Sequence, residues 1–211
     1  MIIESNAFLD GASISARYAA GAMGGAVSEN LNPPLVWRDV PEQTRSFVLI
    51  CHDPDAPAVM DDVGKTDREI PPETPRQNFY HWLLVDLHSG LRSIKEGEFS
   101  SAFVNKGKQD RQAAYGSRQG LNDYTVWNKG NPDVEGLYFG YDGPWPPFND
   151  AIPHRYVFTL FALGADQLDV RGDFNGEDVL QALAVLEEKG LVLAQTSVTG
   201  LYTLNPRLGL I

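Results

Sequence analysis

Residues 46–57 read Ser-Phe-Val-Leu-Ile-Cys-His-Asp-Pro-Asp-Ala-Pro, an apolar run that ends in a rigid acidic motif. The run is short, continuous and apolar, so it predicts a strand buried on both faces of a β-sheet rather than an amphipathic helix. In the motif that follows, Pro54 and Pro57 fix the backbone around the carboxylates of Asp53 and Asp55. We therefore expect a stiff acidic loop at the end of a buried strand.

Three further apolar runs are similar to the first, and they span residues 79–87, 156–163 and 191–198. Twenty Gly and fourteen Pro separate such runs along the chain, as is typical of strands joined by turns. Because the runs are apolar throughout, we expect them to be buried between two packed layers. The chain is therefore predicted to be mainly β.

One clear helix is predicted at residues 176–189. Asn175 can cap its first turn, and Gly190 is expected to end it. Glu177 and Asp178 favour the positive end of the helix dipole. The apolar residues of this segment recur on one face, namely Val179, Leu180, Leu183 and Leu186.

The chain has 211 residues, 43% of them hydrophobic, which is enough for a sizeable core. No internal repeat, low-complexity tract or linker divides it, so we expect one domain over residues 1–211. Two polar stretches, 60–77 and 106–136, would not fill a core because of their Gly, Pro, Asn and charge content. They are predicted to be surface excursions at the mouth of a site.

Seventeen Lys and Arg residues against 28 Asp and Glu residues give a net charge of −11. Such a charge repels DNA, RNA and acidic lipid surfaces, so neither a nucleic-acid partner nor membrane insertion is expected. No apolar stretch approaches the roughly 20 residues of a membrane-spanning helix, and the N-terminus lacks a signal-peptide pattern. Cys51 is the one cysteine, which excludes an intramolecular disulfide and suits a reducing compartment. We expect a soluble, cytoplasmic protein.

Two histidines stand out because of their surroundings. His81 lies inside the most apolar stretch, where a polar side chain must find a hydrogen-bond partner. His154 follows a proline-rich loop, residues 143–147, at the head of another apolar run. Rigid loops with titratable residues at strand ends commonly present a pocket on a β scaffold. The pattern leaves two interpretations open: a pocket built from Asp53, His81 and His154, or ordinary turns and a satisfied core histidine.

No local spacing indicates a metal, cofactor or nucleophile site. The chain has no His-x-x-x-His and no Cys pair, so its four histidines could assemble a metal site only through folding. Residues 116–120 have the wrong register for a nucleophile elbow, and residues 21–25 lack the Lys of a phosphate-binding loop. Cys51 in an apolar strand favours an inert thiol. We expect no cofactor and no metal.

Together these motifs resemble those of the phosphatidylethanolamine-binding protein family, and more closely those of its bacterial and archaeal branch, often labelled Raf-kinase-inhibitor-like. The resemblance runs nearly end to end, and its acidic motif and proline loop are specific to the family. The matching segments are Ser5-x-Ala7-Phe8-x-Asp10-Gly11, Arg17-Tyr18, residues 32–37, residues 46–57, His81-Trp82, Tyr141-x-Gly143-Pro144-x-Pro146-Pro147, His154-Arg155-Tyr156, Leu193-Ala194 and residues 199–202.

The resemblance implies a fold in which a large antiparallel sheet packs on a smaller sheet in Greek-key style, with few helices. It also implies one small pocket that accepts phosphate-like or carboxylate groups, with Tyr202 at its border. The ligand-binding residues implied on this chain are Asp53, Asp55, Pro57, His81, Trp145, Pro146, Pro147, His154 and Tyr156.

Three features depart from the family pattern. Trp145 stands where bacterial relatives usually carry a small residue or Cys, so we expect a pocket that is narrowed or partly plugged by the indole. The stretch 106–136 is longer than in relatives, and residues 148–153 lengthen the approach to His154. Both insertions are expected to alter access to the pocket and the surface for a partner.

The leading functional hypothesis is a non-enzymatic regulatory protein that binds a small anion or phospho-headgroup and modulates a protein partner such as a kinase or protease. An alternative is an acid–base enzyme, a hydrolase or lyase, because two histidines and two aspartates could supply general acid and base. A third is a pure protein-interaction role with a vestigial pocket. A homodimer is expected because bacterial relatives are often paired and Phe148 and Trp145 would need cover.

An anion beside the carboxylates of Asp53 and Asp55 would be repelled unless protons or cations compensate. We expect charged histidine to provide that compensation, so that anion affinity rises as pH falls through the imidazole range near 6.5. The expected role of Asp53 is to orient and charge a neighbouring histidine, with His81 as the anion ligand.

Overall fold

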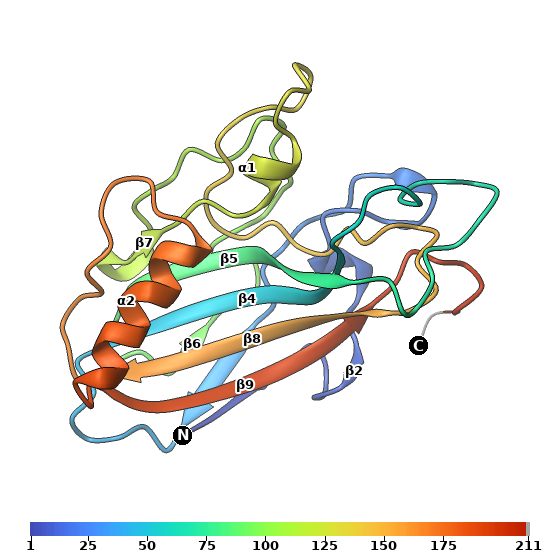
Figure 1. Ribbon diagram of the computed structural model, residues 1–211. Helices are drawn as coiled ribbons and strands as arrows, with labels where there is room; N and C mark the ends of the chain where they lie inside the picture. The colour runs from blue at the N-terminus through green and yellow to red at the C-terminus, as the bar shows by residue number, and fades with distance from the viewer. Residues whose placement is uncertain (210–211) are drawn as a thin grey trace.

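The computed structural model describes residues 1–209, which form two β-sheets (Figure 1). The large sheet has the strand order β2-β9-β8-β4-β5-β7, and the small sheet has the order β1-β3-β6. The strands are β1 Ile2–Ser5, β2 Ala12–Ser13, β3 Leu35–Arg38, β4 Ser46–Pro57, β5 Arg76–His88, β6 Ser93–Ile94, β7 Arg118–Gln119, β8 His154–Leu163 and β9 Val192–Tyr202. The α-helices are α1 Tyr124–Trp127 and α2 Gly176–Glu188, and the 3-10 turns are η1 Ala16–Tyr18, η2 Met23–Gly25 and η3 Ala114–Gly116.

The four predicted apolar runs form β4, β5, β8 and β9, the four long strands at the centre of the large sheet. Their pairings are antiparallel, with β4 between β5 and β8, and β8 beside β9. The short β2 pairs with β9 in parallel, which is the exception to the expected antiparallel order. The predicted mainly β fold with two packed sheets is confirmed.

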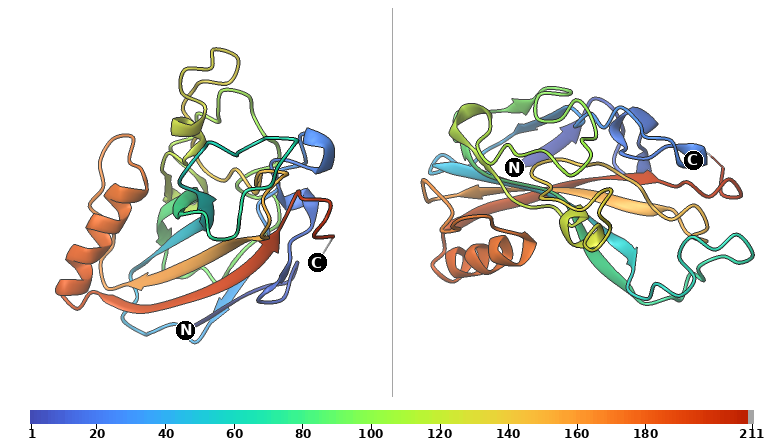
Figure 2. Two further views of the ribbon diagram at one scale, coloured as in Figure 1. Left: turned by 45° about the vertical axis from the view of Figure 1, so that its right-hand side comes forward. Right: turned by 90° about the horizontal axis from the view of Figure 1, so that it is seen from above.

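Alternate residues of β4 face two separate hydrophobic cores. Phe47, Leu49 and Cys51 pack toward the small sheet, where Leu35 and Trp37 of β3 join the same cluster. On the opposite face, Val48 and Ile50 belong to the core that α2 covers through Val179 and Leu183. Figure 2 shows β1 and β3 on one face of the large sheet and α2 on the other. The second face of the buried strands is therefore covered by a helix, a third layer beyond the two expected.

The cap of α2 is the one predicted. The Asn175 side chain accepts hydrogen bonds from the backbone N–H groups of Glu177 and Asp178, and the Asp178 carboxylate accepts from the Asn175 N–H. The helix ends at Glu188, one residue before the predicted end, and Gly190 follows with a positive φ of 68°. Of the predicted apolar face, Leu180 is exposed because it points away from the sheet that Val179 and Leu183 contact.

The acidic motif is part of β4 and not a loop, which corrects the sequence prediction. Beyond His52 the strand no longer pairs with β8, but it continues beside β5, where Ala56 pairs with Gln77 and Pro57 with Arg76. The register shifts between Asp53 and Ala56. A proline is tolerated there because the other edge of the strand is unpaired at this point.

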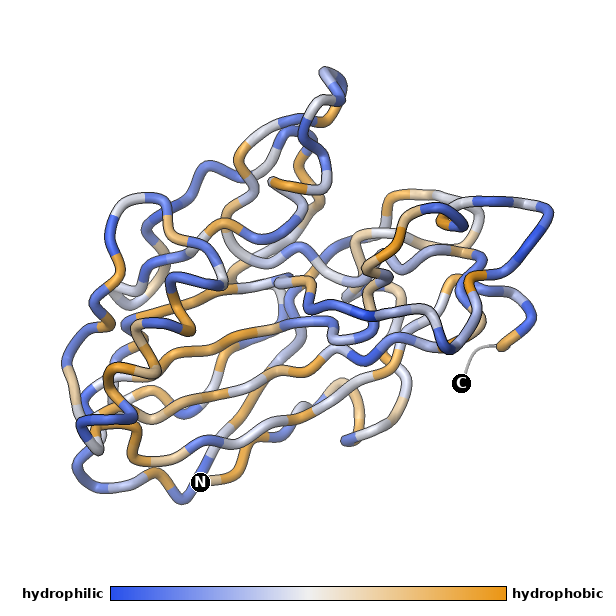
Figure 3. Tube along the Cα trace, viewed as in Figure 1, coloured by the Kyte–Doolittle hydropathy of each residue, from blue (hydrophilic) through white to orange (hydrophobic). Residues whose placement is uncertain are grey.

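The two polar stretches lie largely on the surface, and Figure 3 shows the loop between β4 and β5 as mostly hydrophilic, in contrast to the strands. Residues 106–136 are more ordered than expected because they contain η3, β7 and α1, and Ser117 and Gln119 within them are buried. In residues 1–209, no helix has both the length and the apolar character that a membrane crossing requires.

Figure 1 shows that the loop between β4 and β5, η2 and the end of β9 gather at one end of the large sheet. At this end β4 finishes and β8 starts with His154, which pairs with Tyr202 of β9. The strands thus carry their terminal residues into a space enclosed by loops.

Candidate functional site

The polar residues of the site continue the alternation that builds the core. Phe47, Leu49 and Cys51 of β4 face the core beneath the small sheet, and Asp53 is the next residue in that alternation. On the neighbouring β8, Tyr156 lies in the same core, and His154 precedes it by two positions. One face of the sheet therefore changes from apolar to titratable side chains where the strands end.

His81 reaches the same face through an irregularity in β5. Trp82 pairs with Cys51 and Tyr80 pairs with His52, so His81 has no partner of its own on β4 and forms a β-bulge. A bulge lets consecutive residues point to one face, and His81 lines the site while Trp82 packs into the adjacent core. With strict alternation, the consecutive residues His81 and Trp82 would point to opposite faces of the sheet.

A cavity of about 1010 Å³ lies at this end of the sheet. Eight of the nine residues implied by the family resemblance line it, and Asp55 does not. The lining residues among the nine are Asp53, Pro57, His81, Trp145, Pro146, Pro147, His154 and Tyr156.

His154 lies between two carboxylates. Its Nδ1 is 2.6 Å from Asp53 Oδ2, and its Nε2 is 3.1 Å from Asp150 Oδ2, all within a buried site. Burial alone would lower the pKa of His154, but the two carboxylates outweigh it and raise the pKa to about 9. Both ring nitrogens therefore donate at neutral pH, and His154 is a cation with no free donor.

Each carboxylate of the site also has a cationic partner. Arg76 donates to both oxygens of Asp150 and to the backbone carbonyl of Asp55. Arg155 forms a bidentate pair with Asp55, and despite burial this pair lowers the pKa of the Asp55 carboxyl. The repulsion expected between Asp53, Asp55 and an anion is thus largely compensated within the protein.

His81 is neutral, which corrects the expectation of a charged His81 near neutral pH. Its Nδ1 lies 2.7 Å from the backbone carbonyl oxygen of Asp142, which can only accept, so Nδ1 carries the proton. Burial lowers the pKa of His81 to about 4. The unprotonated Nε2 is then left as a hydrogen-bond acceptor on the cavity-lining side chain. The histidine that Asp53 orients and charges is His154.

Tyr156 supplies the complementary group. Its hydroxyl is buried and has no hydrogen-bond partner within residues 1–209. Its ring lies 5.1 Å from that of His81, centroid to centroid, at an angle of 67°. Burial raises the pKa of Tyr156 well above its usual value, so the hydroxyl keeps its proton and can donate. A buried donor without a partner is costly, which is a reason to expect a ligand there.

A buried polar network fixes the loop that contains Asp142, whose backbone carbonyl accepts the hydrogen bond from His81. The Asp142 carboxylate accepts from Asn30, Asn122 and the ammonium group of Lys108. Asn30 also accepts from the Gly143 backbone N–H at the start of the proline-rich loop. The network thereby ties that loop to the carbonyl that sets the tautomer of His81.

Trp145 forms part of the cavity wall, and the expectation that its indole narrows the pocket relative to bacterial relatives stays a prediction. Its ring lies against the backbone of Gly21, where an added Cβ would be 2.3 Å from the indole. Phe103 packs against its edge, with centroids 5.8 Å apart. The indole is thus held to one side.

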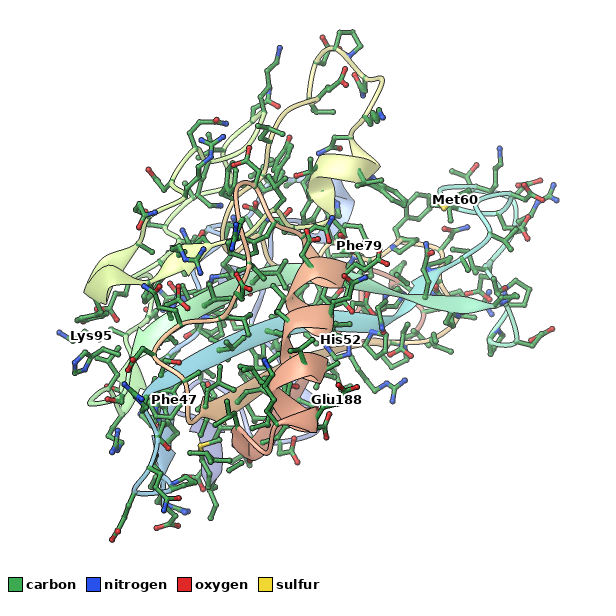
Figure 4. All side chains as sticks on the ribbon, turned by 60° about the vertical axis from the view of Figure 1, so that its left-hand side comes forward. Phe47, His52, Met60, Phe79, Lys95 and Glu188 are labelled. Carbon is green, nitrogen blue, oxygen red and sulfur yellow. The ribbon has the colours of Figure 1, made fainter. Side chains whose placement is uncertain are left out.

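The sequence interpretation missed Arg76 and Asp150. It also missed four aromatic residues that line the cavity, namely Phe79, Phe103, Tyr124 and Trp127. Asp150 lies four positions before His154 in the segment noted for its unusual length, and that spacing was the available signal. Phe79 shares a side of β5 with His81, two positions away, and packs against Tyr124 of α1 with centroids 5.2 Å apart. Figure 4 shows Phe79 next to α1.

The other residues considered as nucleophiles in the sequence, Cys51 and Ser117, have structural roles. Cys51 is fully buried, and burial raises the pKa of its thiol well above the usual value. The hydroxyl of Ser117 donates to the Ala114 carbonyl and is buried. Among residues 1–209, no group of three or more His, Cys, Asp or Glu side chains is arranged to hold a metal ion.

Comparison with known proteins gives a consistent assignment. The sequence model described as phosphatidylethanolamine-binding protein matches residues 4–203. A UPF0098 protein of Aquifex aeolicus is 30% identical over 202 residues, which cover 96% of this chain and 88% of that protein. The UPF0098 protein YbhB of Escherichia coli is 29% identical over 203 residues, or 96% of this chain and all of YbhB.

Among solved structures, the chain is similar to E. coli YbcL, described as a new member of the mammalian PEBP family. The TM-score is 0.64 at 24% sequence identity, and the match covers 95% of this chain and 96% of YbcL. The likeness supports the fold described above.

Proposed function

The chain belongs to the phosphatidylethanolamine-binding protein family, and from this premise we propose that it binds a small ligand with a phosphate or carboxylate head in the cavity at His81 and Tyr156. The observation that carries the proposal is the convergence on one cavity of an unpartnered hydroxyl donor and an unprotonated ring nitrogen. These two groups complement an acidic head that still carries one proton.

One of the two groups donates a hydrogen bond to the head, and the other accepts one from it. The Tyr156 hydroxyl donates to an oxygen of the head, while Nε2 of His81 accepts the proton of a P–OH or carboxylic O–H group. The second pKa of phosphate monoesters is near 6, so the protonated head becomes abundant as pH falls through that range. Affinity is therefore expected to rise with falling pH, with the proton shared between ligand and His81.

His154 contributes charge to the site without contacting the head. Both of its ring nitrogens are engaged by Asp53 and Asp150. A general base needs a free nitrogen and a pKa near the working pH, and His154 lacks the first while His81 lacks the second. These features support a binding function over the hydrolase or lyase alternative.

The experiment is calorimetric titration of methyl phosphate, a monoester that carries its last proton at pH 5.5 and has lost it at pH 7.5, into wild type and Tyr156→Phe at both pH values. Wild type should bind more tightly at pH 5.5, and the variant should lose about tenfold or more in affinity, as expected for one hydrogen bond to a charged group. Tyr202→Phe is the matched control, because Tyr202 does not line the cavity and its buried hydroxyl donates to the Gly21 carbonyl instead. Methyl phosphate affinity that Tyr156→Phe leaves unchanged would contradict the proposal.

Modulation of a kinase or protease, a protein partner, a homodimer and a cytoplasmic location stay predictions from the sequence. The proposed ligand site does not depend on any of them.

A further inference from the structure

The cavity is much larger than an acidic head requires. Ligand sites of roughly 300–1,000 Å³ enclose drug-sized molecules, and this cavity of about 1010 Å³ reaches the upper end of that range. Four of its titratable groups, Asp53, His81, His154 and Tyr156, belong to neighbouring strands at one end of the sheet. An inorganic anion bound there would leave most of the remaining lining without a contact.

That remaining lining is aromatic. We call Phe79, Phe103, Tyr124, Trp127 and Trp145 the aromatic wall, and all five line the cavity. Neighbouring rings meet nearly at right angles, with interplanar angles of 72–78° and centroids 5.2–6.2 Å apart. Rings packed in this way present faces and edges suited to a further ring.

Two rings of the aromatic wall, Tyr124 and Trp145, are held in place by contacts outside the cavity. The Tyr124 hydroxyl donates to the Gly143 carbonyl at 2.9 Å, and Trp145 rests on the backbone of Gly21. Because these rings are fixed by contacts outside the cavity, they form a preorganised surface. A rigid surface favours a compact rigid ligand over a flexible chain, which must lose more conformational freedom on binding.

Large apolar side chains also line the opening of this cavity. Met23, Val27, Trp127 and Phe148 line it while 44–60% of each residue's surface remains exposed. They come from three separate segments of the chain, residues 23–27, α1 and the loop before β8, so local sequence alone does not explain their gathering. Apolar surface around the opening of a large cavity is typical of a ligand-binding site.

We infer that the ligand carries a compact ring-bearing apolar body on its acidic head, and that the aromatic wall with Met23 and Val27 binds that body. This inference rests on the proposed function for the head. It assigns the ligand class as an aromatic phosphate monoester or aromatic acid.

The experiment compares phenyl phosphate, hexyl phosphate and inorganic phosphate by calorimetry at pH 5.5. Phenyl phosphate should bind wild type at least tenfold more tightly than inorganic phosphate, and more tightly than hexyl phosphate, which has the same number of carbons. Equal affinity for phenyl and inorganic phosphate overturns the inference and leaves the proposed function intact. Hexyl phosphate binding as tightly as phenyl phosphate overturns the preference for a ring.

Trp127→Ala tests the wall directly, because Trp127 is half exposed and its loss should leave the fold intact. The variant should lose at least fivefold in affinity for phenyl phosphate and keep the wild-type affinity for inorganic phosphate. Val126→Ala is the matched control from the same helix, since Val126 is 72% exposed and does not line the cavity. An equal loss in both variants, or no loss in Trp127→Ala, overturns the assignment of the wall.

Indole separates the two proposals because it has a ring and no acidic head. Weak binding to wild type that Trp127→Ala abolishes supports the aromatic wall. Indole binding together with no binding of any phosphate overturns the proposed acidic head, and with it the ligand class, while the ring compartment stands. Absence of indole binding in the presence of tight phenyl phosphate binding would place the phenyl group elsewhere and contradict the inference.

Discussion

His154 Nδ1 lies 2.6 Å from Asp53 Oδ2, and this pair joins the end of β4 to the start of β8. Asp150 accepts from the other ring nitrogen, so the imidazolium is enclosed by carboxylates on both sides. The pair explains why one histidine of the site is charged while His81, which contacts a neutral carbonyl, is not.

The first prediction concerns stability against pH. The pKa of His154 is raised in the folded state to about 9 from its ordinary value, so its contribution is complete below about pH 6.5 and is lost as pH rises through about 9. A shift of this size corresponds to on the order of 3 kcal/mol. Asp150→Asn removes one of the two carboxylates and should reduce the pKa shift of His154. The destabilisation caused by the variant should therefore be largest at pH 6 and shrink toward pH 9.5.

Urea denaturation at pH 6, 7.5 and 9.5 provides the measurement. Asp166→Asn is the control, because Asp166 forms an exposed pair with Arg45 and makes no hydrogen bond or ion pair with a histidine of residues 1–209. A loss of stability in Asp150→Asn that is the same at all three pH values would contradict a charged His154.

The second prediction concerns the buried network at Asp142. The Lys108 ammonium lies 2.5 Å from Asp142 Oδ1, and burial raises the pKa of Asp142 although Lys108 opposes that shift. Lys108→Met leaves a buried carboxylate without its cation, which should cost roughly 3 kcal/mol in unfolding free energy. The exposed Lys129→Met variant should be neutral within about 0.5 kcal/mol. A cost below 1 kcal/mol for Lys108→Met would mean that the asparagines alone stabilise Asp142.

The third prediction concerns the contact between Gly21 and Trp145. A Cβ at position 21 would lie 2.3 Å from the indole, so Gly21→Ala must displace the ring and should destabilise the protein by roughly 1–3 kcal/mol. In a Trp145→Ala background the same change should cost much less, because the ring it meets is gone. Denaturation of the four proteins of this cycle gives the coupling. Equal costs in both backgrounds would show that Gly21 is required for another reason.

The sequence predicted the strands and the helix well because local patterns determine them. The continuous apolar run before Cys51 requires burial on both faces, and Asn175 with Asp178 forms a local cap. The extent of β4 was less predictable. Two prolines in residues 53–57 indicated a loop, but pairing with β5 alone is enough to keep them in the strand.

The members of the site were more predictable than their protonation. Rigid proline motifs at strand ends indicated Asp53 and His154, and the family resemblance added Tyr156. The assignment of charge to His81 was wrong because it depends on tertiary neighbours, a carbonyl from Asp142 and deep burial, that no local pattern encodes. The same holds for Arg76, whose partner Asp150 is 74 positions away.

The central claim is that His81 presents an unprotonated Nε2 to an acidic ligand, and ¹⁵N NMR of its imidazole between pH 3 and 8 tests this most directly. Without ligand, His81 should be the Nδ1–H tautomer with a pKa of about 4, and saturating phosphate should raise that pKa by at least one unit because the bound anion stabilises the imidazolium. A His81 that titrates near 6.5 without ligand, or whose pKa phosphate leaves unchanged, would contradict the account.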